Sequence, residues 1–175
     1  MNESQFQARV RELTSFTRET EWVEFKHNNA APEEIGKYVS ALSNSAALLG
    51  KPFAYILWGI EDVTKRIVGT DFRPAQKKVG NEELENWLLT QLDPRVGVSI
   101  HEGSVDGKPL ALFEVQPAPN RPVRFKGVAY IRIGTYKKNL KTIPKRNGNF
   151  GKNLNELPLK RDWLWKTRRL MMCSL

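Results

Sequence analysis

A short apolar segment, Phe53 to Ile60 (FAYILWGI), most strongly constrains the fold of this chain. Its length and its aromatic and branched residues are typical of a strand that is buried on both faces. Such a strand must be covered on each side by other elements. The segment therefore predicts a central strand in a sheet with helices packed on it.

Helical spacing appears in three other places. Residues 33–49 have the most regular pattern: Pro32 suits a first turn, and Gly50 suits the C-terminal stop. The apolar face of this helix would be formed by Ile35, Tyr38, Val39, Leu42, Ala46 and Leu49. Residues 3–14 and 82–92 have shorter patterns of the same kind.

The remaining periodic segments predict strands. One is WVEFK at residues 22–26, and a short strand at 66–69 would pair back on the central one. Strands are also expected at about 97–103, 109–115, 122–126 and 128–133. This order predicts an α+β fold, with a mixed, mostly antiparallel sheet and two or three packed helices, over residues 1–140.

Bulk composition sets wider limits. A length of 175 residues suits one domain followed by a tail, and it allows a sizeable core. No apolar run approaches the ~18 residues of a membrane span, and the N-terminus is too polar for a signal peptide. Cys173 is the only cysteine, so neither an intramolecular disulfide nor a cysteine-based zinc site is expected. We therefore expect a cytoplasmic protein with no membrane partner.

The positive charge of the chain is concentrated in its last third. Residues 121–175 contain 15 Lys and Arg against 2 Asp and Glu, and no acid lies between Glu114 and Glu156. Aromatic residues are interleaved with these cations. The pattern is typical of a surface that faces a polyanion, most commonly nucleic acid, although a solvated basic tail is the simpler alternative.

An acidic and basic pair lies in the first predicted strand. Because side chains alternate between the two faces of a strand, Val23 and Phe25 should enter a core while Glu24 and Lys26 share the other face. Asp62 ends the central apolar run. If carboxylates converge there, they would form an all-oxygen site suited to a hard divalent cation.

Five segments in order, ETEWVEFK, EIGKYVSALSNSA, FAYILWGIED, IVGTDF and YIRIGTYKK, together resemble the Schlafen AlbA domain family. The resemblance covers roughly residues 15–140. It implies a nucleic-acid-binding domain, of the kind found in bacterial regulator-like proteins. It also implies a relation to the Schlafen endoribonucleases, which depend on a metal ion.

In the Schlafen nucleases the site consists of two glutamates, a lysine and an aspartate, and their places are taken here by Glu19, Glu24, Lys26 and Asp62. The resemblance implies that the three carboxylates hold Mg²⁺ or Mn²⁺ and that Lys26 contacts a phosphate oxygen. It implies no zinc site here, because the zinc-binding lobe of those nucleases needs more than one cysteine. No ATP site is expected either, since Gly50-Lys51 lacks the other residues of a phosphate loop.

The basic residues on or near the last two predicted strands are the candidates for nucleic-acid binding. They are Arg121, Arg124, Lys126, Arg132, Lys137 and Lys138. Phosphate contacts from these side chains would position RNA or DNA without reading its sequence. Three functions stay open: a nucleic-acid-binding domain of a regulator or defence protein, a metal-dependent endoribonuclease, and a protein-interaction or oligomerisation module.

The tail from about residue 141 has no helical or strand periodicity. Reading the codons of Pro144 to Leu154 from the third base of the proline codon permits a charged helical sequence that is typical of related proteins. We therefore expect residues 141–175 to be an irregular basic tail that arises from a frameshift. Resequencing tests this, since an intact frame with no better-matching alternative contradicts it.

Overall fold

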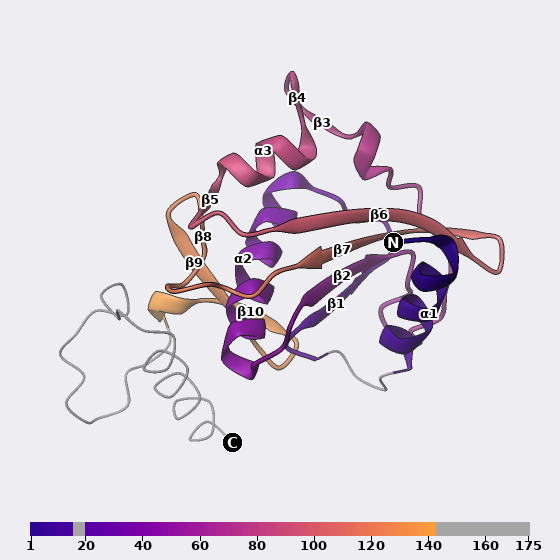
Figure 1. Cartoon of the computed structure of the whole chain (residues 1–175), viewed down its shortest axis with the longest axis horizontal. Helices are drawn as coiled ribbons and strands as arrows, with labels where there is room; N and C mark the ends of the chain where they lie inside the picture. The colour runs from indigo at the N-terminus through magenta and orange to yellow at the C-terminus, as the bar shows by residue number, and fades with distance from the viewer. Residues whose placement is uncertain (16–19, 143–175) are drawn as a thin grey trace.

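The computed structural model describes residues 1–15 and 20–142 (Figure 1). Two four-stranded sheets lie on either side of one long helix. The helices are α1 (Glu3–Thr14), α2 (Pro32–Leu49) and α3 (Leu84–Thr90). The first sheet contains β1 (Val23–Lys26), β2 (Ala54–Trp58), β7 (Lys108–Val115) and β6 (Val98–Val105), in that order. The second contains β10 (Tyr136–Asn139), β9 (Val128–Ile133), β8 (Arg124–Phe125) and β5 (Leu92–Asp93).

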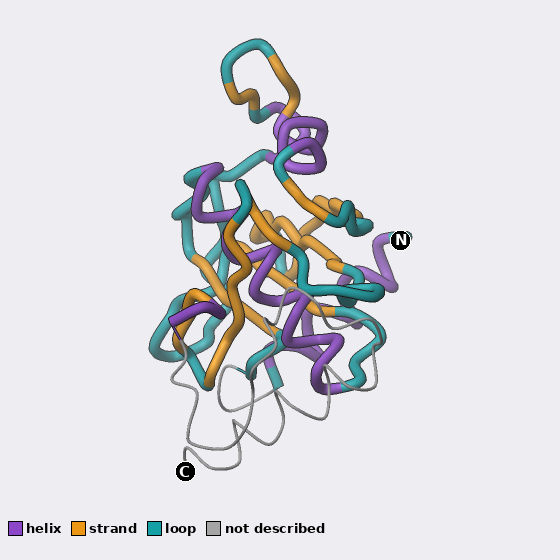
Figure 2. The backbone as a smooth tube through the Cα atoms, turned by 90° about the vertical axis from the view of Figure 1, so that its left-hand side faces the viewer, coloured by secondary structure: helices purple, strands orange, loops and turns teal. Residues whose placement is uncertain are grey.

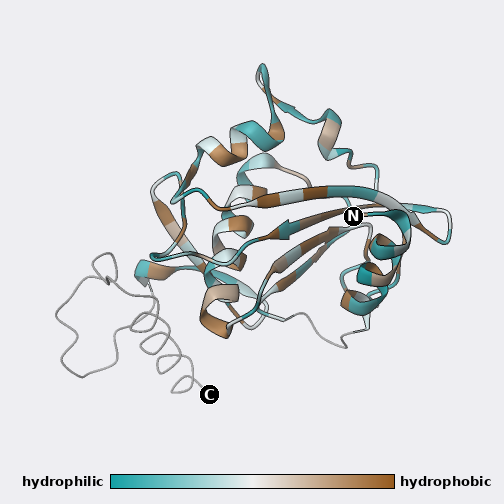
Figure 3. Cartoon of the chain, viewed as in Figure 1, coloured by the Kyte–Doolittle hydropathy of each residue, from teal (hydrophilic) through white to brown (hydrophobic). Residues whose placement is uncertain are grey.

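The first sheet is the mixed sheet that the sequence predicts. β1 and β2 are parallel, and the pairs β2–β7 and β6–β7 are antiparallel. All five residues of β2 are buried, as the apolar run requires. Its two faces contribute to separate cores: Leu57 packs with α1 residues such as Val10, whereas Ile56 packs with α2 residues such as Val39. Apolar residues accordingly dominate β2 and much of β7 (Figure 3).

Helix α2 is covered on both sides, and its polar residues bind the second sheet. Asn44 Nδ2 donates to the carbonyl oxygens of Val123 (2.9 Å) and Tyr130 (2.8 Å), and Asn44 Oδ1 accepts from the Val123 amide (2.7 Å). Ser40 binds the same two residues, donating to the Val123 carbonyl and accepting from the Tyr130 amide. These side chains satisfy backbone groups of β9 and of the segment before β8, which would otherwise be buried without partners. They therefore hold the second sheet in place on α2.

Most predicted elements are confirmed. The helix over 3–14, the strand over 128–133 and the helix that ends at Gly50 occur as expected. The helix predicted over 82–92 is shorter, because Glu82–Glu83 (β4) pairs with Lys78–Val79 (β3) instead. The strand expected at 66–69 is reduced to a single bridge between Ile60 and Ile67.

Several short elements of the structure were not predicted. The β3–β4 hairpin projects from one end of the molecule in both backbone views (Figures 1 and 2). The edge strand β10 continues the chain beyond β9. The predicted tail is described only as far as residue 142, so the frameshift hypothesis concerns residues outside the described part. Within that part, no helix combines the length and the apolar character that crossing a bilayer requires.

Candidate nucleic-acid interface

Glu24 and Lys26 lie side by side on β1, as the alternation predicts. Lys26 Nζ is 2.5 Å from Glu24 Oε1, while Val23 and Phe25 enter the core beneath α1. The face that carries Glu24 is also covered, so this carboxylate is only 3% exposed. A buried carboxylate at this depth needs compensating positive charge.

Arg132 on β9 supplies a second positive charge, beside that of Lys26. Its side chain is 0% exposed, and its guanidinium forms an ion pair with Glu24 Oε2. The Arg132 amide also donates to Ser45 Oγ on α2 (3.1 Å). The expectation that Arg132 faces solvent and binds phosphate is therefore corrected. Because β9 lies against α2, the charge of Arg132 is directed inward, toward the carboxylate on β1.

Tyr38 on α2 lies between two lysines from different strands. Lys26 Nζ donates to the Tyr38 hydroxyl (3.2 Å) and lies 4.5 Å from the ring centroid. Lys137 Nζ of β10 lies 4.1 Å from the same centroid. Both distances are within the range of cation–π attraction. The tyrosine thus brings a lysine from each sheet to one place.

Glu34, one turn before Tyr38 on α2, completes the arrangement. Its carboxylate binds Lys137 Nζ (2.5 Å) and Lys37 Nζ (2.8 Å). The hydrogen bonds from Lys137 and then Lys37 lower the pKa of Glu34 to about 2. Burial lowers the pKa of Lys137, whereas the bond to Glu34 acts in the opposite direction. Lys137 is held as a desolvated cation with one carboxylate partner.

We call these residues the Tyr38 cluster. Its members are Glu24, Lys26, Glu34, Lys37, Tyr38, Arg132 and Lys137. Four basic side chains face two carboxylates, so the charged forms carry an excess of two positive charges. Lys26, Lys37 and Lys137 keep 20%, 32% and 14% of their side chains exposed. An anion that approaches from solvent can therefore reach this excess charge.

Two of the other basic side chains that were predicted to bind phosphate are paired with acidic residues. Arg121 lies 2.6 Å from Asp93, and Lys126 is paired with Glu33. Arg124 is half-buried, and Lys138 is exposed on β10. The acid-free segment 121–138 is thus matched in space by acids from earlier in the chain. The uncompensated positive charge of this segment is therefore smaller than the sequence suggests. What remains of it lies near β10 and the Tyr38 cluster.

The predicted metal site is described only in part. Glu19 lies outside the described residues, and Asp62 is exposed in the turn that follows β2. In the described ranges, no three His, Cys, Asp or Glu side chains are grouped so that they could hold a metal ion. Both Glu24 oxygens already face a cation. Within the described residues Glu24 is therefore not a free ligand, because a metal ion that binds it would have to displace Lys26 or Arg132.

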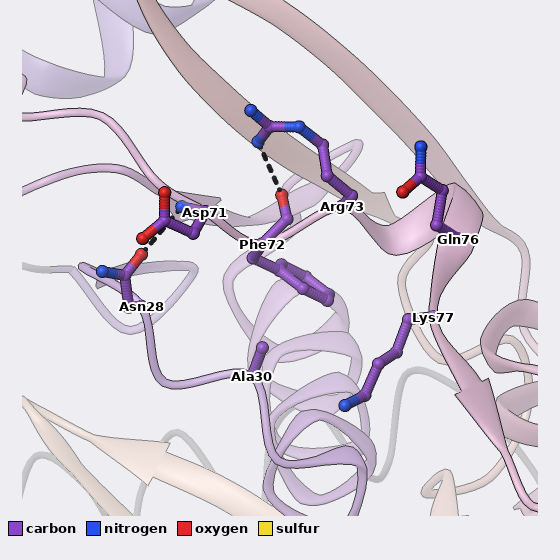
Figure 4. A pocket seen from close by; sticks show the side chains of 7 residues that line it. All are labelled: Asn28, Ala30, Asp71, Phe72, Arg73, Gln76 and Lys77. Atoms are coloured by element: carbon purple, nitrogen blue, oxygen red, sulfur yellow. Dashed lines mark hydrogen bonds between the residues drawn. The ribbon is translucent and has the colours of Figure 1, made fainter.

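A pocket of about 440 Å³ opens elsewhere, where the chain passes from β1 toward α2 (Figure 4). Its lining residues are Asn28, Ala30, Asp71, Phe72, Arg73, Gln76 and Lys77. Asn28 Oδ1 accepts hydrogen bonds from the hydroxyl of Thr70 (2.8 Å) and from the Asp71 amide (3.0 Å). Arg73 donates to the carbonyl oxygens of Thr70 and Phe72. The IVGTDF segment therefore has a structural role in shaping this wall.

Sequence reasoning missed Glu34, Lys37 and Tyr38 as site residues. The sequence pattern gives Glu34 no role in a site, and it places Tyr38 on the apolar face of the helix. The spacing of four residues does place Glu34 and Tyr38 on one side of α2. That signal was available, but nothing in the sequence shows that β10 lies against that side.

The fold and the cluster define an α+β domain with a cationic surface beside its long helix. The sequence matches the family described as Schlafen, AlbA_2 over residues 19–141, and the chain belongs to this family. None of the curated proteins has significant sequence similarity to the chain.

Solved structures share the fold, and two of them are compared with this chain below. The crystal structure of the DIP2311 protein from Corynebacterium diphtheriae is 21% identical, with a TM-score of 0.50 over 78% of this chain and 26% of that one. This chain therefore spans about a quarter of that structure. The solution structure of the N-terminal domain of a RecG-related protein from Nitrosomonas europaea is 20% identical. It also has a TM-score of 0.50, over 87% of this chain and 99% of that domain.

Proposed function

We propose that this domain binds nucleic acid, RNA or DNA, through the Tyr38 cluster and the adjacent edge strand β10. The observation that carries the proposal is the excess positive charge around Tyr38. Three partly exposed lysines, Lys26, Lys37 and Lys137, converge there from β1, α2 and β10. A convergent set of cations from three elements is suited to a phosphate group.

Family membership supports the same proposal, since the Schlafen AlbA domain is regarded as nucleic-acid binding. The name of the Nitrosomonas protein relates it to an ATP-dependent DNA helicase, which also acts on nucleic acid. We place the domain in a regulator or defence protein of the cytoplasm. The fold itself supplies the rigid frame that holds the lysines in position.

Phosphate would bind by exchanging with carboxylates that are already present. Glu34 is 40% exposed, so a phosphate oxygen can compete with it as the partner of Lys37 and Lys137. Lys126 and Arg121 have exposed partners of the same kind. Glu24 differs, because Arg132 keeps it buried. The cluster therefore has an exchangeable outer part and a fixed inner part, and neither part reads the base sequence.

A binding titration tests this proposal. Fluorescently labelled RNA and DNA oligonucleotides are titrated with the whole chain and with a Lys37→Gln, Lys137→Gln double variant. We expect the double variant to bind both nucleic acids at least about tenfold more weakly. Lys78→Gln, in the projecting β3–β4 hairpin and paired with Glu83 rather than with any member of the cluster, is the matched control. Equal affinities for the double variant and the control overturn the assignment of binding to the Tyr38 cluster, and no binding of RNA or DNA by the wild type favours a protein-interaction or oligomerisation module.

A metal-dependent endoribonuclease is the second candidate, favoured by the adjacent Glu24 and Lys26 on β1. In this candidate Glu19, Glu24 and Asp62 would hold Mg²⁺ or Mn²⁺, and the ion would have to displace Lys26 or Arg132 from Glu24. Incubation of RNA with each ion, comparing the wild type with Asp62→Asn, tests it. Cleavage that needs the ion and is lost in Asp62→Asn supports this candidate. Intact RNA under every condition removes it and leaves nucleic-acid binding unaffected.

A further inference from the structure

One aromatic side chain near the cluster is exposed. Tyr136 begins β10 and is 71% exposed, whereas the other large exposed apolar side chains of the described residues are Met1, Leu49, Val63 and Val68. Aromatic rings usually bury most of their area in a core. Tyr136 contributes little to the two cores of this domain, and its ring is accessible to a partner.

The neighbours of Tyr136 on β10 are cations. β10 is the edge strand of its sheet, and side chains alternate along it. Tyr136 and exposed Lys138 share one face, while Lys137 points to the other face, toward Glu34 and Tyr38. The strand therefore presents an exposed aromatic ring with a lysine on each face. Such a combination of a stacking surface with charges for the backbone is typical of proteins that bind single strands.

We propose that β10 binds single-stranded nucleic acid, with a base stacked on the Tyr136 ring and phosphates on Lys137 and Lys138. This proposal rests on the proposed function and specifies the kind of nucleic acid. Every base has a π face, so stacking on Tyr136 does not depend on the base sequence. In a duplex the bases are stacked on one another, and only their edges are accessible from the grooves. The ring of Tyr136 would then have no partner.

The experiment compares three labelled 12-mers with the same number of phosphates per strand: a thymine oligonucleotide, an abasic backbone without bases, and a duplex. Each is titrated by fluorescence anisotropy with the whole chain at one fixed salt concentration. The proteins are the wild type, Tyr136→Ala, Tyr136→Phe and the control Val63→Ala, which alters a side chain that is 90% exposed. Since Tyr136 is largely exposed, none of these changes should prevent folding, and a thermal melt verifies it.

The wild type, Tyr136→Phe and Val63→Ala should bind the thymine strand at least about fivefold more tightly than the abasic strand. Tyr136→Ala should lose that preference while keeping its affinity for the abasic strand. Binding of all three ligands with no dependence on Tyr136 overturns the stacking proposal and leaves the proposed function standing. Tighter binding of the duplex than of the thymine strand also overturns it. No binding to any of the three overturns both.

Discussion

The buried ion pair of Glu24 and Arg132 makes a strong prediction about stability. Glu24→Gln keeps the shape of the side chain but removes its charge, so the ion pair between Glu24 and the fully buried Arg132 is lost. Removal of one member of a buried pair typically costs about 3–5 kcal/mol. Lys26 loses its partner too, but it adds less because it retains 20% exposure. A domain of this size has a total stability of about 5–15 kcal/mol, so the variant should be only marginally stable.

Urea unfolding measured by circular dichroism tests this prediction. A loss of about 4 kcal/mol, with an m value of about 2 kcal/mol per molar urea, lowers the midpoint by about 2 M. Glu61→Gln is the matched control, because it breaks the exposed pair with Arg66 and should hardly move the midpoint. Combining Glu24→Leu with Arg132→Met removes both charges and should recover much of the loss.

A midpoint for Glu24→Gln as close to wild type as that of Glu61→Gln would refute this reasoning. It would show that the carboxylate is not the counter-ion of Arg132. The same prediction bears on the nuclease test. Lost cleavage in Glu24→Gln could follow from unfolding alone, whereas Asp62→Asn changes an exposed side chain and keeps folding separate from catalysis.

Three further changes test the packing and charge of α2. Gly36→Ala should destabilise by about 1–3 kcal/mol in thermal unfolding, although this change usually favours a helix, because its Cβ would lie 2.1 Å from Phe125 Cε2. Asn44→Ala removes three hydrogen bonds and should cost about 3 kcal/mol, with faster hydrogen exchange at the Val123 amide. The pKa of Glu34 is lowered from 4.5 to about 2, so its ionised carboxylate stabilises the folded state fully above about pH 4.5. This contribution should be lost as pH falls from 4.5 toward 2. Glu34→Gln should therefore flatten the acid side of the stability profile.

The sequence was sufficient to predict the fold class, because the buried strand and the long helix have unambiguous patterns. Residues 54–58 and 32–49 carry the central strand and the helix. Several short elements were missed because their few residues show no apolar alternation, as in the polar segment Tyr136–Asn139. β10 was missed for this reason, and with it the position of Lys137.

The candidate site was harder to predict, because it depends on contacts between distant segments. The sequence placed Glu24 and Lys26 on one face of a strand, and this is confirmed. It could not show that the same face is covered, so Arg132 was expected at the surface. The acid-free segment was likewise misleading, since Glu33 and Glu34 compensate its lysines across the fold. The family resemblance, by contrast, could be stated from the order of the motifs, and it is confirmed over residues 19–141.

The dependence of affinity on salt concentration tests the central claim most directly. For single strands, the logarithm of the binding constant should fall linearly with the logarithm of salt concentration, with a slope of about −0.7 per phosphate contacted. We predict that Lys137→Gln weakens binding to RNA and DNA alike and makes the slope shallower by about 0.7, the loss of one phosphate contact. Lys78→Gln should match the wild type. A Lys137→Gln slope and affinity equal to those of the wild type would contradict the assignment of phosphate binding to the Tyr38 cluster.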